Sequence, residues 1–302
     1  MIQVTDVTKK FGNTVAVDHV SFTVHAGEIF GLVGPDGAGK TTVIRMITGI
    51  MEITAGRIEM MGSTASEAIK SQIGYVPQKF SLYRDLTVLE NIELIGSLYG
   101  AKRQVIHELA EEILTFTGLW DFRNRISENL SGGMKQKLAL AAGLMHKPKI
   151  FFLDEPTTGV DPVSRREFWQ MLYRLNKEGM TVVAATPYMD EAELCTRIAF
   201  MDQGKIVACA SPQELRLQYA HRILELQVDS KNVKPILQHC PIIDINSFGD
   251  KYHLVVDDAD QAILQVQATL SSAGRKVLSL KEINPTLEDI FVSLAGGGTQ
   301  YD

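Results

Sequence analysis

The sequence has few cysteines and no long apolar run. No stretch of about 18 consecutive apolar residues occurs, so no segment is predicted to span a membrane as a helix. The opening residues, MIQVTDVTKKF, lack the basic-then-apolar pattern of a secretion signal. The three cysteines, Cys195, Cys209 and Cys240, form no CxxC pair, which argues against a disulfide scaffold or a zinc site and suits a reducing cytoplasm.

Blocks of like charge are missing as well. The 30 basic and 36 acidic residues give a net charge of −6 and are spread along the chain. Because nucleic acids and anionic membranes attract clustered basic residues, no nucleic-acid partner is expected.

Segments typical of strands alternate with segments typical of helices in the first two thirds of the chain. Apolar runs at residues 29–34, 73–77 and 149–156 predict strands buried on both faces, and residues 41–50 have helical spacing. This alternation predicts an α/β fold with a largely parallel sheet. Apolar residues recur at helical spacing through residues 86–146, which predicts a helical insert.

The character of the sequence changes near residue 220. The later segments read as strand, helix, strand, strand, helix, strand, the order of the split βαβ, ferredoxin-like motif. A last helix follows, which Thr286 and Asp289 are placed to cap. We therefore predict two domains, residues 1–219 and a small α+β domain at residues 220–302.

A glycine-rich loop lies between the first buried strand and the helix after it. Its residues, GPDGAGKTT, match the spacing G-x-x-x-x-G-K-[ST]. The glycines allow successive backbone N–H groups to point inward and form an anion nest. Lys40 would reach the outer phosphates, and the hydroxyl of Thr41 would contact Mg²⁺. The candidate nucleotide-binding residues of this loop are Gly34, Pro35, Asp36, Gly37, Ala38, Gly39, Lys40, Thr41 and Thr42.

The segment IFFLDEP at residues 150–156 ends a second buried strand with two acids. Burial of Asp154 and Glu155 would be costly unless a cation or water uses them. Asp154 is placed to hold Mg²⁺ through its water shell, and Glu155 to orient and deprotonate an attacking water. Together with the glycine-rich loop, these acids predict a Mg²⁺-dependent nucleoside triphosphatase.

A second phosphate-binding motif identifies the family. In LSGGMKQK, Ser131, Gly132 and Gly133 precede a helix and form a helix N-terminus that the first site does not need. Two such half-sites in one chain suggest a head-to-tail dimer. With the two earlier motifs, this combination resembles the ATP-binding cassette (ABC) ATPases over about residues 1–215, so residues 1–219 are predicted to form an ABC ATP-binding domain.

The resemblance implies roles for further residues. Phe11 looks like the aromatic residue that stacks on adenine, with a core phenylalanine as the alternative. Gln78 looks like the glutamine that touches Mg²⁺ and the attacking water, with an ordinary loop residue as the alternative. Asp161 resembles part of the loop that crosses the dimer seam, and the helical insert resembles the surface that a transmembrane subunit contacts.

Pro187 departs from the family pattern, which usually has a histidine at this strand tip to contact the γ-phosphate. Three accounts stay open. Thr186 or Tyr188 supplies a hydroxyl instead, or this subunit turns over slowly and pairs with a stronger cassette, or Glu155 suffices. We therefore predict an ATPase, and slow turnover because of Pro187 is one of the three accounts.

The resemblance implies a cytoplasmic subunit, peripheral on the inner face of the cell membrane, that uses Mg²⁺-ATP to drive a separate permease. The residues PDGAGKTT, the single cassette and the tail INPTLEDIFVSL resemble ABC-2 type exporters. This similarity implies an ABC-2 type transmembrane permease as partner, and a homodimer or a heterodimer with a second ABC ATPase. Two rival interpretations are a non-transport cassette ATPase acting on ribosomes or DNA, and a nucleotide-binding regulator. The single cassette disfavours the first, and Glu155 disfavours the second.

Overall fold

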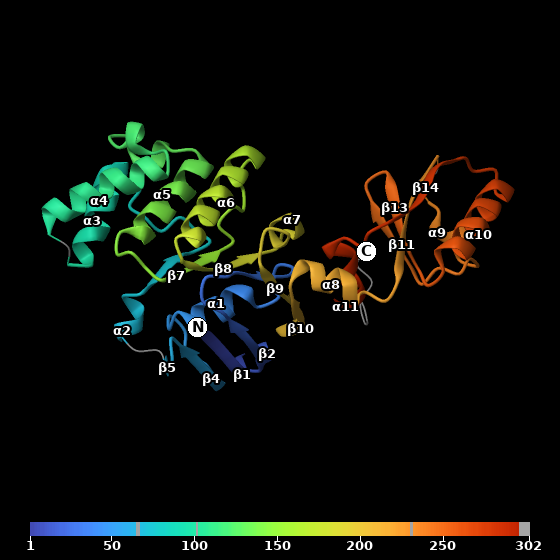
Figure 1. Cartoon of the computed structure of the whole chain (residues 1–302), viewed down its shortest axis with the longest axis horizontal. Helices are drawn as coiled ribbons and strands as arrows, with labels where there is room; N and C mark the ends of the chain where they lie inside the picture. Colours follow the sequence, from blue (N-terminus) through green and yellow to red (C-terminus); the bar gives the residue numbers. More distant parts are fainter. Residues whose placement is uncertain (65–66, 101, 230–231, 296–302) are drawn as a thin grey trace. The chain divides into compact units, whose positions relative to one another are not determined.

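The computed structural model describes residues 1–64, 67–100, 102–229 and 232–295 and divides the chain into two compact units. The first unit is Met1–Ser211 and the second begins at Pro212 (Figure 1). Within the described residues, none of the helices combines the length and apolar character that a membrane crossing needs.

A six-stranded sheet forms the centre of the first unit. Five of its strands run parallel, and the edge strand β10 runs antiparallel to β9. Every residue of β3, β7 and β8 is buried, as expected for a sheet covered on both faces. The strand order is β10 (Lys205–Ala210), β9 (Arg197–Asp202), β3 (Ile29–Val33), β8 (Thr181–Thr186), β7 (Ile150–Asp154), β6 (Ile73–Val76). The predicted α/β fold with a largely parallel sheet is confirmed.

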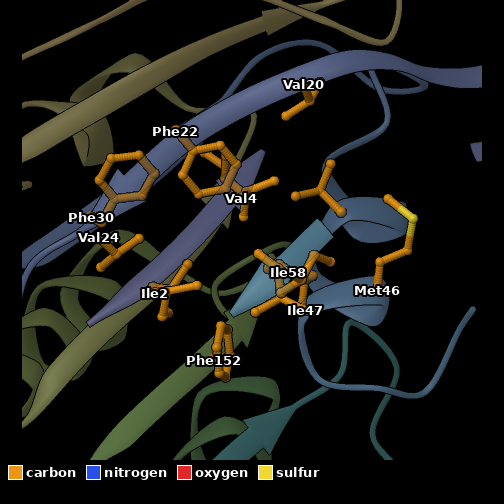
Figure 2. Packing of buried hydrophobic residues seen from close by; sticks show 14 of the residues in the cluster. Ile2, Val4, Val20, Phe22, Val24, Phe30, Met46, Ile47, Ile58 and Phe152 are labelled. Carbon is orange, nitrogen blue, oxygen red and sulfur yellow. The ribbon is translucent and has the colours of Figure 1, made fainter. Parts of the chain in front are cut away.

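A second, antiparallel sheet packs on the first through a shared apolar core. Its strands are β2 (Thr14–Val24), β1 (Ile2–Phe11), β4 (Ala55–Met60) and β5 (Ser63–Thr64), in that order. Ile2, Val4 and Phe22 from this sheet point toward Phe30 and Phe152 of the central sheet (Figure 2). Helix α1 (Lys40–Ile47) adds Met46 and Ile47 to the same core. This packing holds the helix that directly follows the glycine-rich loop.

Helices make up most of the stretch between residues 86 and 146. They are α3 (Val88–Leu98), α4 (Arg103–Phe116) and α5 (Gly132–Leu144), with short 3-10 turns η1 (Trp120–Phe122) and η2 (Ser127–Asn129). Figure 1 shows α3, α4 and α5 gathered on one side of the first unit, away from β1, β2 and β4. Helix α3 begins with a reciprocal cap in which Glu90 N donates to Thr87 Oγ1 and Thr87 N donates to Glu90 Oε2.

Three short or peripheral helices complete the first unit: α2 (Glu67–Lys70), α6 (Pro162–Lys177) and α7 (Met189–Ala192). Helices α6 and α7 follow β7 and β8, respectively. Both therefore begin at the edge of the sheet where the parallel strands end.

The second unit has its own four-stranded antiparallel sheet in the order β12-β13-β11-β14. The first and third strands in the chain lie at its centre, which is the ferredoxin-like arrangement predicted for the strand and helix order. The elements are α8 (Pro212–Gln218), β11 (Arg222–Val228), α9 (Lys234–Leu237), β12 (Asp244–Phe248), β13 (Lys251–Val256), α10 (Ala259–Ser272), β14 (Val277–Ile283) and α11 (Leu287–Ala295).

Two details of the second unit bear on the sequence predictions. Thr286 and Asp289 form the expected cap of α11, since Asp289 N donates to Thr286 Oγ1 and Thr286 N donates to Asp289 Oδ2. The unit begins at Pro212, ahead of the predicted domain start at residue 220, because α8 packs against α11.

Candidate functional site

The glycine-rich loop connects the end of β3 to the first turn of α1. A Cβ on Gly34 would lie 2.0 Å from the carbonyl oxygen of Met201, so only glycine fits at the start of the loop. Gly37 and Gly39 have φ angles of +82° and +102°, which side chains rarely adopt. The predicted loop therefore has the backbone conformation that an anion nest requires, with Ala38 buried beneath it.

Lys40 is folded back onto this loop. Its Nζ donates to the carbonyl oxygens of Gly34 and Pro35, both at 2.8 Å, and lies 3.5 Å from Oε1 of Glu155. The side chain is 3% exposed. A buried ammonium group needs such partners, and phosphate oxygens would be equivalent acceptors in their place.

Thr41 and Asp154 come together although they lie on different elements. Thr41 Oγ1 donates a 2.8 Å hydrogen bond to Oδ1 of Asp154 at the end of β7. Burial raises the pKa of Asp154, and the hydrogen bond from Thr41 acts in the opposite direction. A hydroxyl beside a carboxylate is an all-oxygen donor set, which is the chemistry that Mg²⁺ prefers. The residues present fit the ion predicted from the sequence.

Tyr75 is a neighbour of Asp154 that the sequence analysis missed. Its hydroxyl lies 3.4 Å from Oδ2 of Asp154, and burial raises the pKa of Tyr75. Tyr75 lies on β6, which runs beside β7. The pairing of these two strands, invisible in either segment alone, brings the phenol to the carboxylate.

Glu155 occupies the mouth of the site with its carboxylate held from two sides. Gln78 Nε2 donates to Oε2 at 2.7 Å, and the ammonium group of Lys40 faces Oε1. Glu155 is 7% exposed and has a φ of +50°, a left-handed conformation that is uncommon for a residue with a side chain. The predicted catalytic pair, Glu155 and Gln78, is therefore in direct contact.

Ser131 and Asp161 each cap a helix. Ser131 Oγ accepts from Met134 N at the start of α5, and Asp161 Oδ1 accepts from Val163 N and Ser164 N at the start of α6. Hydrogen bonds from Ser164 hold the pKa of the exposed Asp161 below its usual value. Gly132 is exposed, while a Cβ on Gly133 would lie 2.6 Å from Ser164 Cβ, so α5 and α6 start in close contact.

Phe11 ends β1 with its ring 49% exposed. It is not a core residue, which removes the alternative considered for it. The ammonium group of Lys9 lies 5.2 Å from the ring centroid. Phe11 is about half exposed, with the Lys9 ammonium group over one face of its ring; stacking of a base on this ring stays a prediction.

Around Pro187, the neighbouring side chains are already engaged. Thr186 is fully buried, donates through Oγ1 to Oε2 of Glu191 at 2.5 Å, and accepts from Tyr188 N at 3.1 Å. The ring of Tyr188 lies against the guanidinium group of Arg165, at 4.3 Å. The hydroxyl hydrogen of Thr186 is thus committed to Glu191, which weakens the account in which Thr186 replaces the histidine donor.

Family models match both units. The model described as ABC transporter matches residues 17–158, and the model described as ATP-binding protein DrrA1-3-like, C-terminal domain, matches residues 211–295.

Several named proteins are similar over most of the chain. The probable multidrug ABC transporter ATP-binding protein YbhF of Escherichia coli is 42% identical over 289 residues, covering 93% of this chain and 49% of the relative. This chain therefore spans about half the length of that relative. The linearmycin resistance ATP-binding protein LnrL of Bacillus subtilis is 34% identical over 307 residues, covering 98% of each chain. Nod factor export ATP-binding protein I of a Rhizobium species is 34% identical over 305 residues, covering 98% of this chain and 97% of the relative.

Solved structures agree with the fold of the first unit. The cbiO1 protein of Clostridium perfringens has a TM-score of 0.67 at 24% identity, covering 72% of this chain and 90% of its own. The dimeric structure of MJ0796, a bacterial ABC transporter cassette, has a TM-score of 0.65 at 30% identity, covering 70% of this chain and 98% of its own. With the full-length similarity to LnrL and the assembled loop and acids, these matches show that the chain belongs to the ABC transporter ATP-binding proteins.

Proposed function

We propose that this chain binds Mg²⁺-ATP, hydrolyses it, and thereby drives export through a separate ABC-2 type transmembrane permease. The contact of Glu155 with both Gln78 and Lys40 carries this proposal. It gives a carboxylate with one oxygen near the lysine of the phosphate loop and the other fixed by an amide, at the mouth of an anion-binding loop.

On nucleotide binding, Lys40 Nζ would exchange the carbonyl oxygens of Gly34 and Pro35 for phosphate oxygens. Thr41 and Asp154 would hold Mg²⁺, directly and through its water shell, with Gln78 contributing from the opposite loop. Bound there by Thr41, Asp154 and Gln78, the ion would supply positive charge to offset the charge that develops on the phosphate oxygens. Glu155 would accept the proton of the water that attacks the terminal phosphorus, giving ADP and phosphate. Phe11 would stack on the adenine ring.

We further propose that two cassettes pair head to tail. Ser131 caps a helix of 13 residues that begins with Gly132 and Gly133 and whose N-terminal amides suit a phosphate; Ser131 is exposed. Asp161, also exposed, would lie at the same seam. The second subunit is either another copy of this chain or a related ATPase. Dimeric structures of the similar cassette MJ0796 support the pairing of two cassettes.

A groove on the first unit suits the permease. It has a volume of about 290 Å³ and is lined mainly by apolar groups, including Pro77, Leu82, Leu98 and Tyr99. Leu98 and Tyr99 are 70% and 50% exposed. Because Pro77 directly precedes Gln78, a segment seated in this groove would act on the residue that holds Glu155. Through this contact the subunit would sit at the cytoplasmic face of the cell membrane.

The names of three relatives support export as the direction of transport, since they refer to multidrug transport, linearmycin resistance and Nod factor export. The substrate of this chain is a separate matter, because the described site contains nucleotide-facing groups and the cargo passes through the permease.

The decisive experiment is Mg²⁺-ATP turnover by the purified protein beside its Glu155→Gln variant. Glutamine keeps the shape of the side chain but cannot take the proton, so we expect a loss of about 10²- to 10⁴-fold in kcat. ATP binding by calorimetry should persist in the variant, because Lys40 and Thr41 are intact. Absence of ATP binding by the wild-type protein, or equal turnover in both, would refute the proposed function.

A further inference from the structure

Glu191 is a buried acid outside the predicted catalytic set. It lies on α7 and is 1% exposed. Thr157 Oγ1 donates to its Oε1, and Thr186 Oγ1 donates to its Oε2 at 2.5 Å. A carboxylate withdrawn from water persists only with such partners, so both oxygens of Glu191 are committed to holding neighbouring segments.

The two threonines belong to segments that frame the site. Thr157 is the second residue after Glu155. Thr186 ends β8, immediately before Pro187, and its carbonyl oxygen accepts from Gly34 N at the start of the phosphate loop. Glu191 thus connects the loop that follows the catalytic acid to the strand tip where the family usually has histidine.

Arg165 balances the charge of this cluster. Its Nε lies 3.6 Å from Oε1 of Glu191, and its Nη1 lies 3.3 Å from Oδ2 of Asp190. The same guanidinium group covers the ring of Tyr188. The carboxylate therefore faces two hydroxyls and one cation, which favours a fixed orientation.

The backbone of Glu155 needs such an anchor. Its left-handed φ of +50° belongs to a sparsely populated region, which persists only where the surroundings hold it. Glu155 N donates to Ala185 O, next to Thr186, and Thr158 N donates to Glu155 O, next to Thr157. Each of these backbone hydrogen bonds therefore involves a residue that directly adjoins Thr186 or Thr157, the two threonines bonded to Glu191.

We propose that Glu191 is a positioning residue for ATP hydrolysis, which aims Glu155 by fixing Thr157 relative to the tip of β8. This inference rests on the ATPase function proposed above. Pro187 offers no side-chain donor, and its backbone has no N–H; the strand tip is instead held from behind, by the carboxylate of Glu191.

The test compares Glu191→Gln with Glu193→Gln, an exposed acid two positions further along. Glutamine has one acceptor oxygen in place of two, so one of the two threonine hydroxyls loses the acceptor for its hydrogen. In Glu191→Gln we expect kcat to fall by about 10- to 100-fold, while the Kd for ATP from calorimetry changes by less than about twofold. Hydrogen exchange of residues 155–161 should accelerate in the nucleotide-free protein. Glu193→Gln should match the wild type in all three measurements.

A second pair of variants isolates the hydroxyl. Thr157→Ser keeps the donor to Glu191 and should retain turnover, whereas Thr157→Val removes it and should reproduce the loss in kcat. Equal turnover of these two variants, or unchanged turnover and hydrogen exchange in Glu191→Gln, would overturn the positioning role. A wild-type protein without turnover would refute the proposed ATPase function, while the exchange experiment would still test the anchoring of residues 155–161.

Discussion

Gln78 and Glu155 lie 77 positions apart in the sequence, and Gln78 Nε2 donates a 2.7 Å hydrogen bond to Glu155 Oε2. Gln78 follows β6 and Glu155 follows β7, two adjacent parallel strands that end at the same edge of the sheet. The orientation of the Glu155 carboxylate therefore depends on the loop that leads from β6 toward α3. A movement of this loop would reach Glu155 through one hydrogen bond.

The first prediction concerns that bond. Gln78→Ala should lower kcat about tenfold, because Glu155 loses the amide that fixes one of its oxygens. The Kd for ATP should change by less than about twofold, since Lys40 and the phosphate loop are untouched. Steady-state ATPase assays and calorimetry measure the two quantities. Lys79→Ala, at the exposed neighbouring position, serves as the control; a Gln78→Ala protein with the turnover of this control would contradict the prediction.

The contiguous motifs made much of the site predictable from the sequence. The contact of Thr41 with Asp154 follows from two motifs placed at the carboxyl ends of parallel strands, where side chains from different segments meet. The buried strands were recognisable because they are apolar on both faces. In each case a short contiguous segment identifies the residues, and the geometry of a parallel sheet determines which of them meet.

Contacts that depend on tertiary placement were not predictable. Tyr75 reaches Asp154 only because β6 pairs with β7, and nothing in the residues DEAE distinguishes the buried Glu191 from the exposed Glu193. Helix α8 belongs to the second unit because it packs on α11, far away in the chain. A domain boundary read from local composition has no access to such a contact.

The second prediction concerns Pro187. A histidine there would add a side-chain donor at the tip of β8, where the hydroxyl of Thr186 is already engaged by Glu191. A preorganised donor of this kind is worth about 10² to 10³ in rate when its geometry is ideal. We expect Pro187→His to raise kcat by about tenfold, less than the ideal gain, because the neighbouring Thr186 and Tyr188 already contact Glu191 and Arg165 and were not arranged around an imidazole donor.

Two controls accompany this variant. Pro187→Ala removes the ring without adding a donor, so it should not reproduce the gain. Pro187→His combined with Glu155→Gln should remain inactive if the gain passes through the same carboxylate. Equal or lower turnover in Pro187→His would show that the site works without a histidine, and the account in which this subunit turns over slowly would be abandoned.

The last prediction concerns Asp289 in the second unit, which is 1% exposed. Its Oδ1 lies 2.8 Å from Nδ1 of His253, and its Oδ2 accepts from Thr286 N and Thr286 Oγ1. Burial alone would raise the pKa of Asp289, but the hydrogen bonds from His253 and Thr286 outweigh burial and hold the pKa below its ordinary value of 3.8. Because the folded-state pKa is depressed, this carboxylate stabilises the unit above pH 3.8, and the contribution is lost as the pH falls through the folded-state pKa.

Asp289→Asn should therefore lower the free energy of unfolding of the second unit by about 1–3 kcal/mol at pH 7, because asparagine offers only one acceptor oxygen. This loss is measured by unfolding the full chain in urea and using hydrogen exchange in α11 as the readout for the second unit. The exposed Glu288→Gln is the matched control and should stay within about 0.5 kcal/mol of the wild type. The difference between Asp289→Asn and the wild type should narrow as the pH falls below 3.8, since protonation then removes the same charge from the native side chain. A difference that stays constant from neutral to acidic pH would mean that the charge of Asp289 does not stabilise the fold.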